Sequence, residues 1–236
     1  MLGSFYLLTK TSDVVVDNAA ALGKKLGIPT LALGLILGAV TSMPELFVSV
    51  GAMIGGSPEL GLANIVGSNI ANSLLILGAT AVIAPITPQG LSWKFNTWAM
   101  MGATAAFSGL MLTGVMPTIA GVGLLGGLAA YKIGSFIAAK KDKVAHDGED
   151  NSPLGKLPKW FNGVYGVAGI AGLVMAADTL VGSASAFASG MGVPAALVGA
   201  LAVAVGTSLP ELTVNVKAAL KGETAMAVGN VLGSNI

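Results

Sequence analysis

Long apolar runs follow one another along the chain, separated by short breaks of glycine, proline, lysine or tryptophan. Most runs reach the length of a membrane-spanning helix, for which about 20 apolar residues suffice. We predict seven full spans, at residues 4–22, 28–54, 60–84, 93–113, 116–139, 161–187 and 194–219. A further run begins near Ala225 and continues to the last residue as a partial eighth span. The pattern therefore predicts an all-α polytopic membrane protein.

The composition agrees with this prediction and narrows the chemistry. Hydrophobic residues make up 54% of the 236 residues and charged residues only 10%, which excludes a water-soluble domain. Because the sequence contains no cysteine, disulfides and thiolate metal sites are excluded as well.

The placement of lysines predicts how the spans are oriented in the membrane. All cations are lysines, and apart from Lys10 they gather at alternate ends of the predicted spans. The junctions without lysine lie near residues 55–60, 113–117 and 188–194. Because cytoplasmic loops are enriched in lysine, we expect the N-terminus outside and the polar segment 140–159 in the cytoplasm. This segment is the expected linker between an N-terminal half, 1–139, and a C-terminal half, 160–236.

Two stretches of the sequence are near copies of each other. The copies read Thr41-Ser42-Met43-Pro44-Glu45-Leu46 with Gly67-Ser68-Asn69-Ile70, and Thr207-Ser208-Leu209-Pro210-Glu211-Leu212 with Gly233-Ser234-Asn235-Ile236. An odd number of predicted crossings separates them, so the second copy should cross the membrane in the opposite direction. This predicts an inverted-topology repeat of five-helix halves, with one repeat at 28–84 and the other at 194–236.

Both copies place polar side chains on one face of a predicted helix. These residues recur at intervals of four, which puts them on the same side of an α-helix. The four polar stripes are Thr41, Glu45 and Ser49; Asn64, Ser68 and Asn72; Thr207, Glu211 and Asn215; and Asn230 with Ser234. A carboxylate near the centre of a bilayer costs at least a few kcal/mol unless it has partners. Two such glutamates therefore indicate an ion site on which the stripes converge.

Two prolines, Pro44 and Pro210, lie inside the predicted spans and should interrupt the helices. Proline removes a backbone donor, so carbonyls near residues 38–41 and 204–207 are expected to lose their helical partners. A bound cation can satisfy such carbonyls. The resulting all-oxygen ligand set suits Ca²⁺ or Na⁺ rather than zinc or copper.

Other residues inside the spans have structural interpretations. Small and polar residues also join transmembrane helices, and we expect Gly67 and Gly233 to serve close helix packing. Asp13, Asp17 and Asp178 lie in apolar spans without oxygen-rich surroundings in the sequence. Either a gating or a packing role is open for these three aspartates.

With these motifs laid out, the chain resembles the cation/calcium antiporter superfamily, in particular prokaryotic-type sodium/calcium exchangers. Those proteins carry two inverted alpha repeats with the pattern Gly-Thr-Ser-x-Pro-Glu and Gly-Asn-x-x-Gly-Ser-Asn-Ile. The resemblance implies ion ligands at Thr41, Ser42, Glu45, Ser68, Asn72, Thr207, Ser208, Glu211 and Ser234, with carbonyls near Gly38 and Ala204. It also implies that the first and sixth spans slide against the core that holds the site.

The sequence departs from the family pattern at several places. Val40 stands before Thr41 and Ala63 before Asn64, where the family usually has glycine, and Asn215 replaces an expected serine. The residue that matches Asn72 in the second copy falls at position 238, beyond the last residue. The last helical pair of the family's ten-helix fold is also absent, and the first span looks short. We therefore expect a truncated chain.

The resemblance implies a secondary active antiporter that exchanges Ca²⁺ for Na⁺ across the cell membrane by alternating access. Its partners are these two ions and the lipid bilayer, and we expect no enzymatic activity, no cofactor and no nucleic acid. A proton-coupled or K⁺-dependent exchanger is the nearest alternative, because carboxylates also release protons. The amide of Asn72, in place of another carboxylate, favours sodium. A passive cation channel and a purely structural scaffold are the remaining alternatives.

Overall fold

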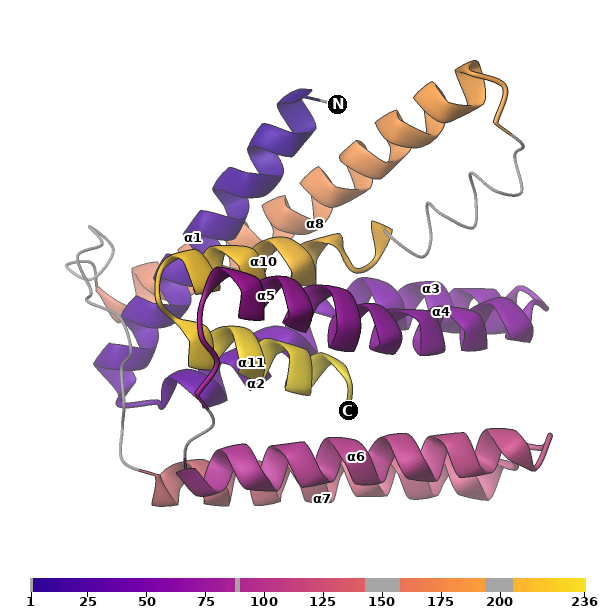
Figure 1. The fold of residues 1–236 in the computed structure, drawn as a ribbon, viewed down its shortest axis with the longest axis horizontal. Helices are drawn as coiled ribbons and strands as arrows, with labels where there is room; N and C mark the ends of the chain where they lie inside the picture. The colour runs from indigo at the N-terminus through magenta and orange to yellow at the C-terminus, as the bar shows by residue number, and fades with distance from the viewer. Residues whose placement is uncertain (1, 88–89, 143–157, 194–205) are drawn as a thin grey trace.

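The computed structural model describes residues 2–87, 90–142, 158–193 and 206–236, and every regular element in them is a helix (Figure 1). The elements are α1 (Leu2–Leu26), α2 (Thr30–Thr41), α3 (Met43–Ile54), α4 (Pro58–Ile70), the π-helix η1 (Ala71–Ile76), α5 (Leu77–Ile83), α6 (Gly90–Leu112), α7 (Thr118–Lys141), α8 (Lys159–Gly190), α10 (Leu209–Leu220) and α11 (Thr224–Ser234). The predicted all-α fold is confirmed for these residues. Residues 143–157 of the expected linker and 194–205 of the expected seventh span lie outside them.

The helices break where the prolines predict. Ser42 separates α2 from α3 with φ −83° and ψ 7°, and Pro44 follows in the first turn of α3. Ser208 has nearly the same conformation, φ −93° and ψ 2°, directly before α10 and Pro210. Proline is tolerated in a first helical turn because its missing N–H has no helical partner there. Both Pro-Glu motifs therefore place their glutamate at the start of a new helix.

The predicted span at 60–84 is not a single regular helix. It consists of α4, the π-helix η1 and α5, and the wider turn of η1 spans Ala71–Ile76. Asn64, Ser68 and Asn72 remain buried on one side despite this change of period. π-turns occur frequently at functional sites, where they reorient side chains. Here η1 contains Asn72, one of the candidate ligands.

Glycines bring α2 and α11 into close contact although the two helices are far apart in the sequence. A Cβ atom at Gly34 would overlap the backbone of Met226, and one at Gly38 would overlap the carbonyl of Asn230. On the opposite helix, a Cβ on Gly233 would lie 2.6 Å from the carbonyl of Leu35. Pairs of glycines four residues apart allow helix backbones to approach in this way. The packing expected for Gly233 is thus observed.

Gly67 differs from Gly233 in this respect. No described atom lies within 4 Å of a Cβ built on Gly67. The close packing expected at Gly67 is therefore not observed among the described residues.

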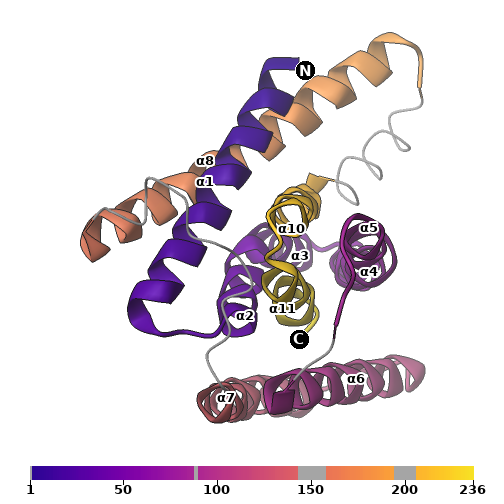
Figure 2. The ribbon, with the colours of Figure 1, turned by 60° about the vertical axis from the view of Figure 1, so that its left-hand side comes forward.

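Figure 2 shows the α1–α8 pair on one side of the bundle and the α6–α7 pair on the other, with α2, α10 and α11 between them. α1 and α8 meet closely at Gly172, where a Cβ would lie 3.0 Å from Thr11 Cγ2. α6 and α7 are joined by Asn96, whose Oδ1 accepts hydrogen bonds from Tyr131 at 2.8 Å and Ser135 at 2.9 Å. The central helices are therefore covered on two sides.

Ion pairs tie α1 to α10. Lys217 Nζ lies 3.1 Å from Asp13, and Lys221 Nζ lies 3.3 Å from Asp13 and 2.6 Å from Asp17. Both aspartates were gating or packing candidates from the sequence, and the two lysines had indicated only the orientation of the spans. Asp178 is exposed. The ion pairs explain how charged residues are accommodated in an otherwise apolar helix.

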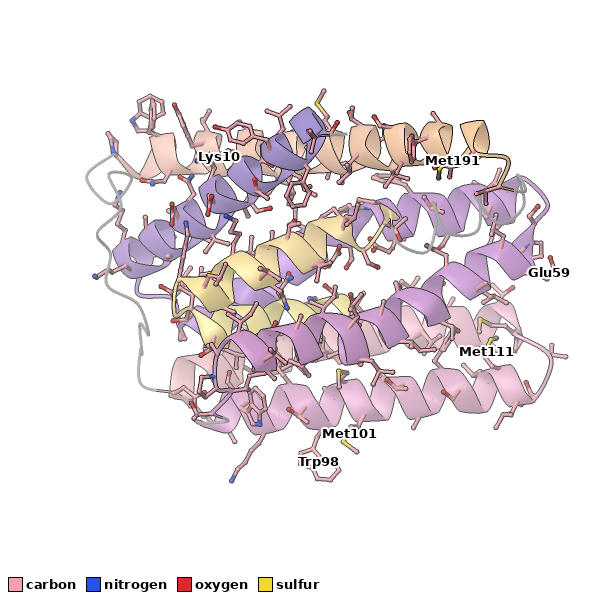
Figure 3. The ribbon with its side chains drawn as sticks, turned by 45° about the horizontal axis from the view of Figure 1, so that its top comes forward. Lys10, Glu59, Trp98, Met101, Met111 and Met191 are labelled. Atoms are coloured by element: carbon pink, nitrogen blue, oxygen red, sulfur yellow. The ribbon has the colours of Figure 1, made fainter. Side chains whose placement is uncertain are left out.

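Much of the outer surface is apolar. Four helical segments are long and apolar enough to cross a membrane, judged by length and composition: Thr30–Ile54, Pro58–Ile83, Thr118–Ala139 and Trp160–Gly190. Large apolar side chains also point outward from α6, such as Trp98 and Met101, which are 70% and 52% exposed (Figure 3). Such a surface is suited to contact with lipid. The sequence suggested a short first span at 4–22, but the helix α1 is 25 residues long.

Candidate ion-binding site

Glu45 and Glu211 occupy equivalent positions in the first turns of α3 and α10. Their relative exposures are 8% and 1%, so both carboxylates are removed from solvent. The first turn is the positive end of a helix dipole, which favours a negative charge there. None of the ion pairs between described residues involves either glutamate. The protein therefore holds two buried carboxylates without a basic partner from the described chain.

The two motifs meet in space and exchange hydrogen bonds. Ser42 Oγ, at the break between α2 and α3, donates to Glu211 Oε1 at 2.9 Å. Ser208 Oγ, at the start of α10, donates to Glu45 Oε1 at 3.4 Å. The serine of each motif thus contacts the glutamate of the other. Sequence segments 166 residues apart are therefore joined by hydrogen bonds.

Three buried acceptor oxygens of the candidate ligands have no hydrogen-bond donor among the described residues. They are Glu45 Oε2, Glu211 Oε2 and Asn72 Oδ1. A buried acceptor without a partner costs free energy, and native structures almost always satisfy it. A hard cation satisfies such oxygens directly, since carboxylate, amide and hydroxyl oxygens are its preferred ligands. The chemistry of these oxygens therefore fits a bound cation.

Two further candidate hydroxyls lie beside the carboxylates, and a third contacts α2. Thr41 lies beside Glu211, and Thr207 lies beside Glu45. Ser234 Oγ donates to the carbonyl of Gly38 at 3.3 Å.

The other candidates differ in what their oxygens contact. Ser68 Oγ donates to the Ile65 carbonyl of its own helix at 3.1 Å. The carbonyl of Gly38 keeps its helical bond, because the Ser42 amide donates to it at 3.1 Å. The expectation that Pro44 frees this carbonyl is therefore wrong, and its second lone pair faces Ser234 Oγ. Ala204 lies outside the described residues.

The sequence profile of the sodium/calcium exchanger protein family matches residues 1–137 and 162–236, which is most of the chain. The chain belongs to this family. The resemblance stated from the Pro-Glu motifs is confirmed. The family consists of transporters rather than enzymes, and the apolar helices agree with an integral membrane protein.

Individual relatives agree with the family assignment. The chain is 32% identical to the putative antiporter CaxA of Alkalimonas amylolytica, covering 100% of this chain and 75% of that protein. It is also 32% identical to the sodium/calcium exchanger MaX1 of Methanosarcina acetivorans, covering 100% of this chain and 78% of that protein. The solved structure of the sodium-calcium exchanger NCX_Mj, soaked with Na⁺ and Ca²⁺, superposes with a TM-score of 0.83 at 28% identity. That match covers 100% of this chain and 76% of the other.

Asn235 and Ser73 were not predicted as participants in the candidate site, but hydrogen bonds connect them to the candidate ligand Asn72. Asn72 Nδ2 donates to Asn235 Oδ1 at 3.0 Å, and Asn235 Nδ2 donates to Ser73 Oγ at 2.9 Å. Asn235 is thus the contact through which the second motif reaches η1. The Gly-Ser-Asn-Ile repetition pointed to this residue, but its partner lies 163 positions earlier and no local spacing indicates it.

Proposed function

We propose that this chain exchanges Ca²⁺ for Na⁺ across a membrane by alternating access, at one midplane site built from both Pro-Glu motifs. The observation that carries the proposal is the reciprocal bonding of Ser42 with Glu211 and of Ser208 with Glu45, together with three buried oxygens of candidate ligands that have no donor among the described residues. The relatives named as sodium/calcium exchangers support the choice of ions.

The ligand chemistry accounts for coupling between the two ions. Two carboxylates neutralise one Ca²⁺, whereas Na⁺ ions need less charge and more neutral oxygens. The proposed ligands are Glu45, Glu211, Thr41, Ser42, Ser68, Asn72, Thr207, Ser208 and Ser234, with the carbonyls of Gly38 and Ala204. Because Ca²⁺ and Na⁺ would share these oxygens, binding of one excludes the other. Competition of this kind links the two fluxes.

The proposal includes an inverted-topology repeat with one copy at 28–84 and the other at 194–236. The opposite chain directions of α3 and α10 support it (Figure 1). Lysine placement supports an N-terminus outside the cell membrane and a cytoplasmic linker at 140–159, between membrane halves at 1–139 and 160–236. Seven full spans with a partial eighth follow from the apolar runs.

α1 and α8 are the proposed moving helices. They pack chiefly against each other at the side of the bundle, while the glutamates lie on the central helices α3 and α10 (Figure 2). The ion pairs of α1 with Lys217 and Lys221 would hold α1 against α10 in this conformation. Movement of the pair past the core would expose the site to one side of the membrane at a time.

Calcium flux in sealed vesicles tests the proposed coupling. We expect an outwardly directed Na⁺ gradient to drive Ca²⁺ uptake by the reconstituted protein, and an equal K⁺ or choline gradient to drive none. Uptake that needs only a pH gradient would show that H⁺, and not Na⁺, is the coupled ion. A requirement for K⁺ would indicate a K⁺-dependent exchanger. Ca²⁺ flux without any counter-ion, at channel-like rates, would overturn exchange altogether.

A further inference from the structure

Two buried asparagines outside the proposed ligand set connect the motifs to each other. Thr41 Oγ1 lies 3.3 Å from Asn230 Oδ1, and Thr207 Oγ1 lies 3.4 Å from Asn64 Oδ1. Asn64 and Asn230 hold equivalent positions in the two copies and are 5% and 0% exposed. In both cases a threonine of one motif meets an asparagine of the other copy. The same cross-connection thus occurs twice.

The orientation of Asn230 is fixed by a chain of hydrogen bonds that ends on the backbone. Asn215 Nδ2 donates to the Ala227 carbonyl at 3.0 Å, and a carbonyl can only accept. Asn215 therefore turns Oδ1 toward Asn230, whose Nδ2 donates to it at 2.6 Å. Asn230 must then present Oδ1, an acceptor, to Thr41.

The first copy reaches the same result with a shorter chain. Asn64 Nδ2 donates to the backbone carbonyl of Glu45 at 3.3 Å and to Ser49 Oγ at 3.0 Å. The carbonyl again fixes which end of the amide donates. Asn64 consequently presents Oδ1 to Thr207. Serine at position 49 thus takes the accepting role that Asn215 has in the second copy.

This orientation matters because a hydroxyl has one hydrogen and two lone pairs. A threonine can ligate a cation only when its hydrogen points away from the ion. Thr41 also lies beside Glu211, whose carboxylate is itself a proposed ligand. The Gly38 carbonyl, 3.4 Å from Thr41 Oγ1, is itself a proposed ligand. Asn230 Oδ1 is the acceptor outside the ligand set.

We propose that Asn230 and Asn64 are positioning residues that take the hydroxyl hydrogens of Thr41 and Thr207, so that each threonine oxygen presents a lone pair to the transported cation. This inference rests on the proposed function. Each asparagine acts on the ligand of the opposite motif. The two halves of the site are therefore competent for ion binding only when they are assembled together.

A double-mutant cycle on cation affinity tests the proposal, with Ca²⁺ and Na⁺ as titrants of the purified protein in calorimetry. We expect Thr41→Val and Asn230→Leu each to weaken binding about fivefold, the effect of one hydrogen bond or ligand contact. The double variant should be no weaker than Thr41→Val alone, since Asn230 acts through Thr41. The matched control is the double variant of Thr207→Val and Asn230→Leu. Because Asn230 is proposed to act on Thr41 and not on Thr207, the two losses of affinity should multiply. The cycle of Thr207 with Asn64 should repeat the first result.

Asn215 provides a test position one hydrogen bond further from Thr41, because it contacts Asn230. Asn215→Ser reproduces the arrangement of Ser49 and should keep affinity within about twofold, whereas Asn215→Val should weaken it like Asn230→Leu. These variants also serve if Asn230→Leu does not fold. The melting temperature of each variant without ions separates an affinity change from a general loss of stability.

Distinct results would overturn the proposal. Multiplying effects of Thr41→Val and Asn230→Leu, or equal affinities of Asn215→Ser and Asn215→Val, would reduce the asparagines to structural residues while leaving the exchange site intact. A wild-type protein that binds neither Ca²⁺ nor Na⁺ would overturn the proposed function together with this inference.

Discussion

Glu211→Gln is expected to abolish Na⁺-driven Ca²⁺ uptake and to weaken Ca²⁺ binding at least about a hundredfold. The substitution keeps the shape of the side chain and an oxygen that can accept from Ser42, but it removes one of two buried charges. Loss of a charged partner from a buried site costs about 3 kcal/mol or more, which corresponds to that factor. Glu45→Gln should have a comparable effect, because Glu45 holds the equivalent position beside Ser208.

Glu59 offers a matched control for these variants. It follows Pro58 in the first turn of α4, so it shares the Pro-Glu-Leu sequence and a place in the first helical turn, but it is exposed at the end of that helix (Figure 3). We expect Glu59→Gln to keep the Ca²⁺ affinity and flux of the wild type. Equal losses in Glu59→Gln and Glu211→Gln would show that a general charge effect is responsible. Full activity of Glu211→Gln would contradict the assignment of the site.

Gly34→Ala is expected to destabilise the protein by about 3 kcal/mol, at the upper end of ordinary overpacking effects. The added methyl group overlaps the backbone of α11 at Met226 and Gly229, and backbone atoms cannot rotate aside as a side chain can. Separation of α2 from α11 would also move Thr41 away from Asn230. Both the melting temperature in detergent and the Ca²⁺ affinity should therefore fall.

The control for this prediction is Gly51→Ala on α3. Gly51 is also helical, but no described atom lies within 4 Å of a Cβ built there. Alanine has the higher helix propensity, so Gly51→Ala should leave the melting temperature unchanged or slightly higher. A similar loss in both variants would argue against close α2–α11 packing as the cause.

Local chemistry explains which features could be predicted from the sequence. The breaks before Pro44 and Pro210 follow from the missing amide hydrogen of proline, a property of the residue itself. The burial of Glu45 and Ser49 follows from their spacing of four residues on α3, whereas Thr41 is buried at the end of α2. The repetition of these motifs then indicated the family, which the sequence profile confirmed.

Contacts between distant segments could not be predicted in the same way. Nothing near Ser42 in the sequence indicates that its hydroxyl bonds Glu211 rather than Glu45. That choice depends on the packing of distant segments, as does the close approach of α2 and α11 at Gly34 and Gly229. The π-turn η1 was not predicted either, because its residues have the composition of an ordinary apolar helix.

The ion pair between Lys221 and Asp17 could not be predicted from the sequence either. Lys221 at the end of a predicted span was sufficient to predict orientation, but not its ion pair with Asp17 on α1. The partners are separated by 204 positions, and several lysines had equivalent placement in the sequence. Only the packing of α1 along α10 selects this pair.

Titration of the purified wild-type protein with Ca²⁺ at increasing Na⁺ concentrations tests most directly whether both ions share one site. A shared site predicts an apparent Ca²⁺ dissociation constant that rises with Na⁺ more steeply than in direct proportion, because more than one Na⁺ replaces each Ca²⁺. Choline at equal ionic strength should leave that constant unchanged. A Ca²⁺ affinity that is independent of Na⁺, or that responds equally to choline, would contradict the account.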